Sequence, residues 1–328
     1  MTSALARLRR RTALLAAAAA ATLAWPAAQA QISKPVRVMV GFPAGGGTDA
    51  IARILAEPMK DALGVPVMVD NKAGAGGQLA AQALKAAPAD GTVLFLSHDH
   101  SISILPQVMK APGFDPATDF VPVAGFATFV NALAVSGGTP AQNYKDYVQW
   151  VKAQGGKGNV GVPAPASVPQ FLVQVLGQRN ALDLVAVPYR GSAPMMADML
   201  GNQIAAGVGS IPDFIENHKA GKLRVVAVMG KERQALMPEV PTLAELGVPG
   251  FEDIPYYGLF APAGTPPAVL EQLSRAVALA LQKPEVKDKL TAMGLTVGFM
   301  TGQQLGARER AYTQTWTRII RDSGFQPQ

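Results

Sequence analysis

Apolar runs of strand length alternate with stretches of helical periodicity through most of the chain. Residues 36–40 form a continuous run rich in valine, and residues 50–63 follow with apolar side chains at helical spacing. The pattern repeats with an apolar run at 65–69, a helical stretch at 78–86 and another apolar run at 93–96. This alternation predicts a parallel sheet flanked by helices.

The same alternation recurs in the middle and at the end of the chain. Further strands are predicted at residues 129–135, 159–162, 184–187, 223–229 and 257–261, and further helices at 144–154, 168–177, 193–200, 266–282 and 284–293. A last helix opens at Thr301, where Gln304 completes a capping box three residues on. Two α/β units are the simplest interpretation, with a ligand cleft where their strand ends face each other.

Residues 1–30 have the pattern of a cleaved secretory signal. Four arginines between positions 7 and 11 precede an apolar run at 13–24, and Ala28-Gln29-Ala30 supplies a cleavage site. The apolar run is about 12 residues long, shorter than the ~20 that a spanning helix needs. We therefore expect an exported, periplasmic product that begins at Gln31, by either general or twin-arginine secretion.

The charge of the chain looks different once this segment is removed. The 328 residues hold 29 Lys and Arg and 23 Asp and Glu, a formal charge of +6, but four of the arginines leave with the signal and the charge falls to +2. We therefore expect neither nucleic acid nor an anionic membrane surface as a partner. The absence of cysteine excludes disulfides, thiolate metal sites and a cysteine nucleophile.

Catalytic signatures are absent from the sequence: there is no phosphate-binding P-loop, no G-x-S-x-G and no H-E-x-x-H. His98-Asp99-His100 is the one cluster that could carry chemistry, just after a predicted strand. It could contact a ligand, hold a metal or act as an enzyme base with Asp99, or it could be an ordinary polar loop. We expect no metal, because three adjacent residues need a further ligand to close a site, and we expect no cofactor and no enzymatic activity.

Glycine-rich loops between predicted strands and helices indicate an anion site. The loop at residues 42–49 joins the first strand to the first helix, and a second loop containing Gly74 and Gly76 precedes the second helix. In the middle of the chain, residues 189–192 open another helix after a strand. Glycine lets backbone N–H groups approach a ligand, and a helix start favours a carboxylate or phosphate. Tight connections without a ligand are the alternative interpretation.

The chain resembles the Bug family of periplasmic solute-binding proteins, the receptor components of tripartite tricarboxylate transporters. The stretches that carry the resemblance run in order through the predicted mature chain, at residues 42–49, 69–77, 89–92, 119–123, 187–191, 241–245 and 261–266. The resemblance implies a type II periplasmic binding protein, with two doubly wound α/β lobes, two crossover segments and a ligand cleft between the lobes. Lobe 1 is expected at 31–128 and 233–328, and lobe 2 at 129–232.

The resemblance also implies a function and a binding site. We expect a monomeric receptor that captures a small carboxylate and delivers it to the membrane subunits of a transporter; a ligand sensor that feeds a signalling partner is the alternative. The predicted ligand-binding residues are Phe42, Pro43, Ala44, Gly45, Gly46, Gly47, Thr48, Asp49, Gly74, Gly76, Ser97, His98, Ser167, Gln170, Tyr189, Arg190, Gly191, Ser192 and Tyr256.

This chain departs from the family pattern at three places. Gln170 stands where many members have a histidine, Tyr256 stands where a tryptophan is common, and residues 97–100 are more polar than expected at that strand end. A ligand with a hydroxyl or amino group besides its carboxylate would suit Asp49, His98 and Gln170.

Overall fold

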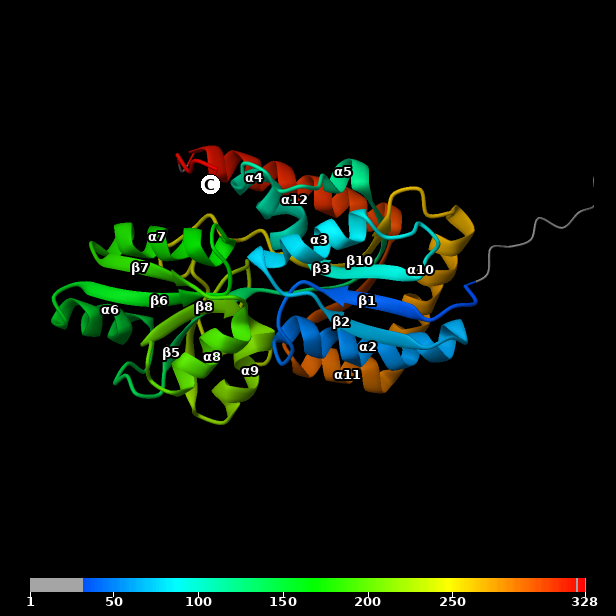
Figure 1. The fold of residues 1–328 in the computed structure, drawn as a ribbon. Helices are drawn as coiled ribbons and strands as arrows, with labels where there is room; N and C mark the ends of the chain where they lie inside the picture. Colours follow the sequence, from blue (N-terminus) through cyan, green and yellow to red (C-terminus); the bar gives the residue numbers. More distant parts are fainter. Residues whose placement is uncertain (1–31, 323, 328) are drawn as a thin grey trace, which may run out of the picture. The chain divides into compact units, whose positions relative to one another are not determined.

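Within residues 32–322 and 324–327, which the computed structural model describes, the strands form two separate sheets (Figure 1). The predicted signal at 1–30 lies outside the described residues. In the part of the chain that is described, no helix is both long and apolar enough to cross a membrane.

The first sheet has the strand order β11-β4-β10-β3-β1-β2. Its strands are β1 (Val36–Val40), β2 (Val67–Asn71), β3 (Val93–His98), β4 (Phe120–Thr128), β10 (Tyr256–Pro262) and β11 (Thr296–Thr301). As predicted, β1 pairs in parallel with β2 and with β3. The strands added later in the chain differ, since β10 lies antiparallel between β3 and β4.

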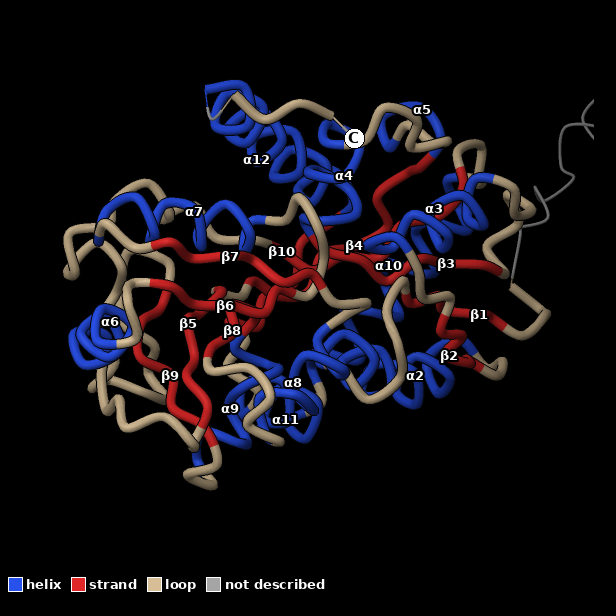
Figure 2. The backbone as a smooth tube through the Cα atoms, turned by 60° about the vertical axis from the view of Figure 1, so that its left-hand side comes forward, coloured by secondary structure: helices blue, strands red, loops and turns tan. Residues whose placement is uncertain are grey.

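Helices cover both faces of this sheet (Figures 1 and 2). They are α2 (Gly47–Leu63), α3 (Gln78–Lys85), α4 (Leu105–Val108), α5 (Pro116–Asp119), α10 (Pro267–Gln282), α11 (Pro284–Ala292) and α12 (Gly302–Asp322). Alternate residues of β3 serve the two faces: Leu94 and Leu96 belong to the buried cluster that holds α2 and α10, and Phe95 to the one that holds α3 and α12. The sheet is therefore buried on both sides, which explains the continuous apolar runs of its strands.

The second sheet has the order β7-β6-β8-β5-β9. Its strands are β5 (Asn131–Ser136), β6 (Lys157–Val162), β7 (Asp183–Pro188), β8 (Ala206–Ser210) and β9 (Leu223–Val228), and its helices are α6 (Tyr144–Ala153), α7 (Val168–Asn180), α8 (Ser192–Leu200) and α9 (Ile211–Lys219). Strand β6 pairs in parallel with β7 and β8, and β5 runs antiparallel to β8 and β9.

Two crossover segments join the sheets. The chain leaves the first sheet at Thr128 and enters the second at Asn131, and it leaves the second at Val228 and returns at Tyr256. This is the two-lobe α/β architecture, with two crossover segments, that the resemblance implies. The expected lobe limits, 31–128 with 233–328 and 129–232, remain a prediction about where each lobe begins and ends.

Several local predictions can be compared with the structure. Thr301 and Gln304 exchange the two hydrogen bonds of the predicted capping box, at 2.9 and 3.2 Å. The sequence does not predict strands β4, β8 and β11 or helix α9, and residues 98–100 do not form the ordinary polar loop that was one interpretation of them. Instead His98 is the last residue of β3, and a π-helical segment, η2 (His100–Ile104), follows almost at once. The alternation of polar and apolar residues in that segment gives no clear helical periodicity.

Candidate functional site

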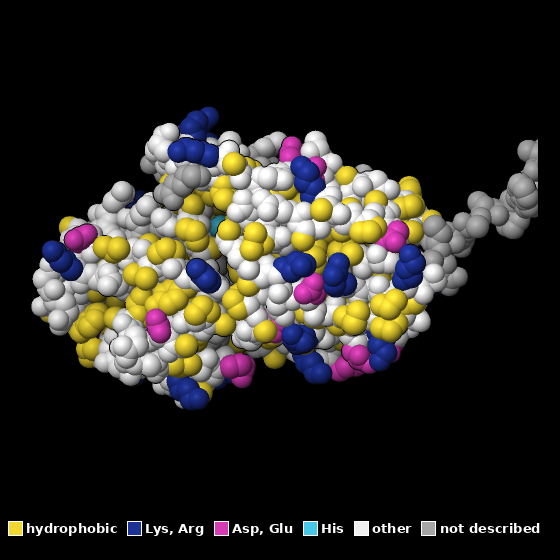
Figure 3. All heavy atoms as spheres, viewed as in Figure 1, with side chains coloured by type: hydrophobic (Ala, Val, Ile, Leu, Met, Phe, Trp, Pro, Cys, Tyr) yellow, Lys and Arg dark blue, Asp and Glu magenta, His cyan; other side chains and the backbone are white. Residues whose placement is uncertain are grey.

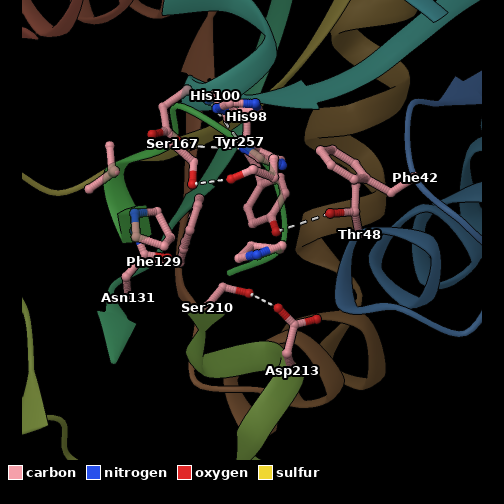
Figure 4. A pocket seen from close by; sticks show the side chains of 15 residues that line it. Phe42, Thr48, His98, His100, Phe129, Asn131, Ser167, Ser210, Asp213 and Tyr257 are labelled. Carbon is pink, nitrogen blue, oxygen red and sulfur yellow. Dashed lines mark hydrogen bonds and ion pairs between the residues drawn. The ribbon is translucent and has the colours of Figure 1, made fainter. Parts of the chain in front are cut away.

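A cavity lies where β1, β3 and β10 of the first sheet meet the helix starts of the second lobe (Figure 4). The residues that line it are Phe42, Thr48, His98, Asp99, His100, Phe129, Asn131, Pro163, Ala164, Ser167, Val168, Pro169, Ser210, Asp213 and Tyr257. Its volume is about 50 Å³. In this conformation the cavity suits a small solute.

Aromatic rings form one wall of the cavity. The imidazole of His98 stacks on Phe42, with centroids 5.1 Å apart, and meets Tyr257 edge-on at 5.4 Å and Phe129 edge-on at 5.8 Å. Tyr257 is buried, its hydroxyl lies 3.4 Å from Thr48 Oγ1, and burial raises its pKa. This wall is mostly apolar, but it presents the Tyr257 hydroxyl and an edge of the His98 imidazole to a bound molecule.

Three helices begin at the cavity. Thr48 lies in the first turn of α2, Ser167 is the N-cap residue of α7 and Ser210 is the N-cap residue of α9. The first N–H groups of a helix have no acceptor within the helix, and its start carries about half a positive elementary charge. Two of these groups are already used, Gly47 N–H by Asp213 and Ile211 N–H by Val130 O, and Pro169 and Pro212 have none, so the other first-turn N–H groups are the ones left for a ligand. Among the described residues, no lysine or arginine lines the cavity. Positive potential therefore comes from helix starts, the usual arrangement for an anion held by backbone groups.

Asp213 connects the two lobes beside the cavity. Its Oδ1 accepts hydrogen bonds from the N–H of Gly47, at 2.9 Å, and from Ser192 Oγ, at 2.6 Å, while its Oδ2 accepts one from Ser210 Oγ at 2.6 Å. Gly47 belongs to the first lobe and the other three residues to the second. A carboxylate of the protein itself thus occupies part of the α2 helix start.

The two loops predicted as the ligand-binding elements of each lobe do meet. A Cβ on Gly191, whose φ is +103°, would lie 2.7 Å from Pro43 Cδ, and a Cβ on Gly46 would lie 3.1 Å from Ser192 Oγ. Glycine at these positions lets the backbones approach closely. Gly47 is equally tight, because a Cβ there would lie 2.9 Å from Asp213 Oδ1.

Asp49 turns back into its own loop. Its carboxylate accepts hydrogen bonds from the N–H of Gly45 and from Asn71 Nδ2, each at 3.0 Å, and it pairs with the guanidinium of Arg53. Burial by itself raises the pKa of Asp49, but the bonds from Arg53, Gly45 and Asn71 outweigh burial and hold that pKa below its ordinary value. The residue therefore fixes the shape of the loop from which α2 begins.

The two histidines have different surroundings. His98 Nδ1 lies 3.1 Å from Asp99 Oδ1 and 3.4 Å from the backbone N of His100. It donates to the carboxylate in the tautomer protonated on Nδ1 and accepts the His100 N–H in the other tautomer. Asp99 Oδ2 accepts a second bond from the Tyr312 hydroxyl at 3.0 Å. His100 is buried and neither ring nitrogen has a hydrogen-bond partner among the described residues. Burial and the neighbouring His98 lower its pKa to about 4, so its ring is neutral at pH 7.

Phe42, Thr48, His98 and Ser167 are the predicted residues that line the cavity. The others lie around it. Gln170 Oε1 accepts the N–H of Ala166 at 2.7 Å, and the Tyr189 hydroxyl donates to Asp198 at 2.7 Å, where burial and that carboxylate raise the pKa of Tyr189 to about 12. Arg190, Ala44 and Gly45 are exposed.

Four predicted residues lie behind the cavity wall. Tyr256 bonds to Ser103 Oγ at 2.8 Å, and Ser97 Oγ is buried with no partner among the described residues. A Cβ on Gly74 would meet Leu79, and one on Gly76 would lie 2.5 Å from His100 Nε2. Gly76 thus closes the cavity from behind by packing against the imidazole of His100.

The sequence reasoning missed several lining residues, above all Ser210, Asp213 and Tyr257. Ser210 and Asp213 follow β8, whose sequence Ala-Gly-Val-Gly-Ser lacks the β-branched run that marks the other strands. A signal was present nonetheless, because Ser-Ile-Pro-Asp places an N-cap serine, a proline in the first turn and an acid at the third helical position.

The cavity lacks a constellation typical of catalysis or of a metal site. Among the described residues no group of three or more His, Cys, Asp and Glu side chains could hold a metal ion. Asp99 orients His98 as a general base requires, but in residues 32–322 no serine or threonine hydroxyl is hydrogen-bonded to either histidine ring.

Comparison with known proteins gives the same picture. The model of the tripartite tricarboxylate transporter family receptor matches residues 51–325. Protein BugT of Bordetella pertussis is 32% identical over 293 residues, which cover 89% of this chain and 90% of BugT.

Solved structures agree in fold over nearly the whole chain. The periplasmic binding protein BugD and a Rhodopseudomonas palustris protein with adipate are each 29% identical and superpose with a TM-score of 0.85, covering 90% of this chain and 99% of theirs. MatC of Rhodopseudomonas palustris with bound malate is 27% identical, with a TM-score of 0.81 over 88% of this chain and 99% of MatC. The chain therefore belongs to the receptor family of the tripartite tricarboxylate transporters, the Bug proteins, and is a solute-binding protein of that family.

Proposed function

We propose that this receptor captures a small carboxylate between its lobes in the periplasm and delivers it to the membrane subunits of a tripartite transporter. The observation that carries the proposal is the convergence of the starts of α2, α7 and α9 on a cavity whose lining, in the described part of the chain, holds no lysine or arginine. Helix starts stabilise a carboxylate through backbone N–H groups and their partial positive charge. The adipate and malate in the two Rhodopseudomonas palustris structures support this ligand class.

Capture follows from the contacts around the cavity. The carboxylate of the ligand accepts hydrogen bonds from first-turn N–H groups and from the hydroxyl of Thr48, partly through bridging water. The hydroxyls of Ser167 and Ser210 already donate to Ala164 O and to Asp213 Oδ2. The aromatic wall around His98 covers the rest of the ligand. Closure brings Asp213 onto Gly47, so the cross-lobe bond forms when the cavity is shut.

Delivery rests on export and on recognition of the closed form. The signal expected at 1–30 directs the chain to the periplasm, where it acts as a monomer. The membrane subunits then distinguish closed from open receptor because only closure brings the loops at 42–49 and 189–192 together. Uptake of the ligand into vesicles that carry the membrane subunits should require this protein. Uptake of the ligand in the absence of this protein contradicts the delivery step.

The capture step is tested by thermal unfolding with a panel of small carboxylates. A ligand present at about one hundred times its Kd adds about 2.7 kcal/mol to the free energy of unfolding. Malate, adipate, hydroxy acids and amino acids form the panel, and neutral sugars of similar size are the control. A stabilising shift with at least one carboxylate and none with sugars is expected. No shift with any carboxylate contradicts the proposal, and turnover of a bound carboxylate contradicts its assignment as a receptor.

A further inference from the structure

His100 is the one polar side chain of the cavity lining whose hydrogen-bonding atoms are both buried and unpartnered within the described residues. The residue is 5% exposed. A histidine that only fills a core normally has at least one partner, because an unpaired buried polar group carries the cost of its lost hydration. In Figure 4 the two histidines lie toward one end of the cavity, and Ser210 and Asp213 lie toward the other.

The chain holds this ring from behind. A Cβ on Gly76 would lie 2.5 Å from His100 Nε2, so the backbone of the loop at 74–77 covers that edge of the imidazole. His98 and Asp99 are already paired with each other, and Asp99 also binds Tyr312. Two ring nitrogens at this end of the cavity therefore have no partner among the described residues and are not covered by Gly76: Nε2 of His98 and Nδ1 of His100. Of the two histidines, His100 is the one with neither nitrogen paired.

The charges around His100 favour an uncharged group. Asp99 adjoins His100 in the chain, and no lysine or arginine is among the described residues that line the cavity. Burial keeps the His100 ring neutral at pH 7, so it offers no positive charge to a second carboxylate. A neutral imidazole nitrogen is a donor in one tautomer and an acceptor in the other. A hydroxyl or an amide can pair with either tautomer, whereas a carboxylate can pair with only one.

We propose that His100 is a specificity-determining residue that binds an uncharged hydrogen-bonding group, a hydroxyl or an amide, at the far end of a small carboxylate. The ligand is then an acid with two functional groups, its carboxylate at the helix starts and its second group at the imidazole. This inference rests on the proposed function, since it assumes that the helix starts hold the carboxylate.

Calorimetric titration at pH 7.5 with matched ligands tests the inference. The first set is butanoate, 4-hydroxybutanoate and succinate, and two further sets lengthen each compound by one and by two methylenes. The variants are His100→Leu, which removes both nitrogens, and His100→Gln, which keeps a donor and an acceptor. His218→Leu is the control, because His218 lies outside the cavity and bonds to the N–H of Val225. Thermal unfolding confirms that each variant is folded.

The expected result is that the wild-type protein binds the best-fitting hydroxy acid at least about 5-fold more tightly than the unsubstituted acid of equal length. That ratio falls to within 2-fold in His100→Leu, is partly kept in His100→Gln and is unchanged in His218→Leu. A wild-type ratio near one, or a ratio that persists in His100→Leu, overturns the inference. The inference is also overturned if the wild-type protein prefers the dicarboxylate and His100→Leu abolishes that preference, because the imidazole would then bind a charged group. If the wild type binds none of the acids, the proposed function itself fails.

Discussion

Removing the Asp213 carboxylate should shift the empty receptor toward its open form. The bond from the N–H of Gly47 to Asp213 Oδ1, at 2.9 Å, joins the lobes, whereas the bonds from Ser192 and Ser210 lie within the second lobe. A hydrogen bond to a charged group contributes about 1.5–3 kcal/mol. Asp213 is only half-buried, so we take the lower end, about 1.5 kcal/mol, which corresponds to about a tenfold change in the closed-to-open ratio.

The absence of cysteine makes this measurable with site-specific labels. Lys145 on α6 and Glu271 on α10 are exposed, one in each lobe, and cysteines there carry a spin-label pair. Asp213→Ala should broaden and lengthen the inter-label distance distribution in ligand-free protein. Asp213→Asn keeps an oxygen acceptor and should change it less, and Asp198→Asn, whose partner Tyr189 is in the same lobe, should leave it unchanged. Superimposable distributions for wild type and Asp213→Ala would refute the reasoning.

Three other predictions concern individual side chains. The pKa of His100 is about 4 in the folded protein and 6.5 in the unfolded chain. The corresponding contribution to the free energy of unfolding is therefore fully present above pH 6.5, and about 3 kcal/mol of it is lost as the pH falls toward 4. Urea unfolding between pH 4 and 7 should show a shallower pH dependence in His100→Leu, and equal slopes for the two proteins contradict this. Gly191→Ala places a Cβ 2.7 Å from Pro43 Cδ at a residue whose φ is +103°. The substitution should therefore lower the free energy of unfolding by about 1–3 kcal/mol, measured in urea, and weaken ligand binding. An unchanged urea midpoint and an unchanged Kd contradict this packing. Tyr312→Phe removes the bond to Asp99 and should cost about 1–3 kcal/mol by urea unfolding, whereas Tyr189→Phe, whose partner is less buried, should cost less; the reverse order contradicts the assignment.

Much of the fold could be predicted because its signals are local. The apolar run at 36–40, the helical spacing after it and Gly64, which ends α2 with a φ of +72°, lie close together in the sequence. Strand β8 carries no such signal, since two of its five residues are glycine, and β11 is an edge strand with several exposed residues. Their pairing depends on partners far away in the chain, which a single-sequence pattern does not contain.

The site was harder to predict than the fold, because it depends on which way each side chain points. Tyr256 and Tyr257 are adjacent in β10 and face opposite sides of the sheet, so choosing the wrong one moves a predicted contact from the cavity to the far side of its wall. Gln170 was predicted to contact the ligand, yet its Oε1 accepts a hydrogen bond from the backbone N–H of Ala166. Asp213 accepts the N–H of Gly47, a contact between residues 166 positions apart that a local sequence pattern does not contain.

The surface offers less guidance about function than the cavity. On the face shown in Figure 3, lysine, arginine and acidic side chains are interspersed rather than gathered into one patch. This distribution agrees with the small net charge expected for the chain after the signal is removed. Surface charge on this face therefore does not indicate where an anion binds.

The central claim, that the converging helix starts bind a carboxylate, is tested most directly by a crystal structure of the protein with the carboxylate that stabilises it most. The account predicts that carboxylate oxygens lie within hydrogen-bond distance of first-turn N–H groups of α2, α7 or α9 and of the hydroxyl of Thr48. A carboxylate bound instead through lysine or arginine side chains, or outside this cavity, would contradict it.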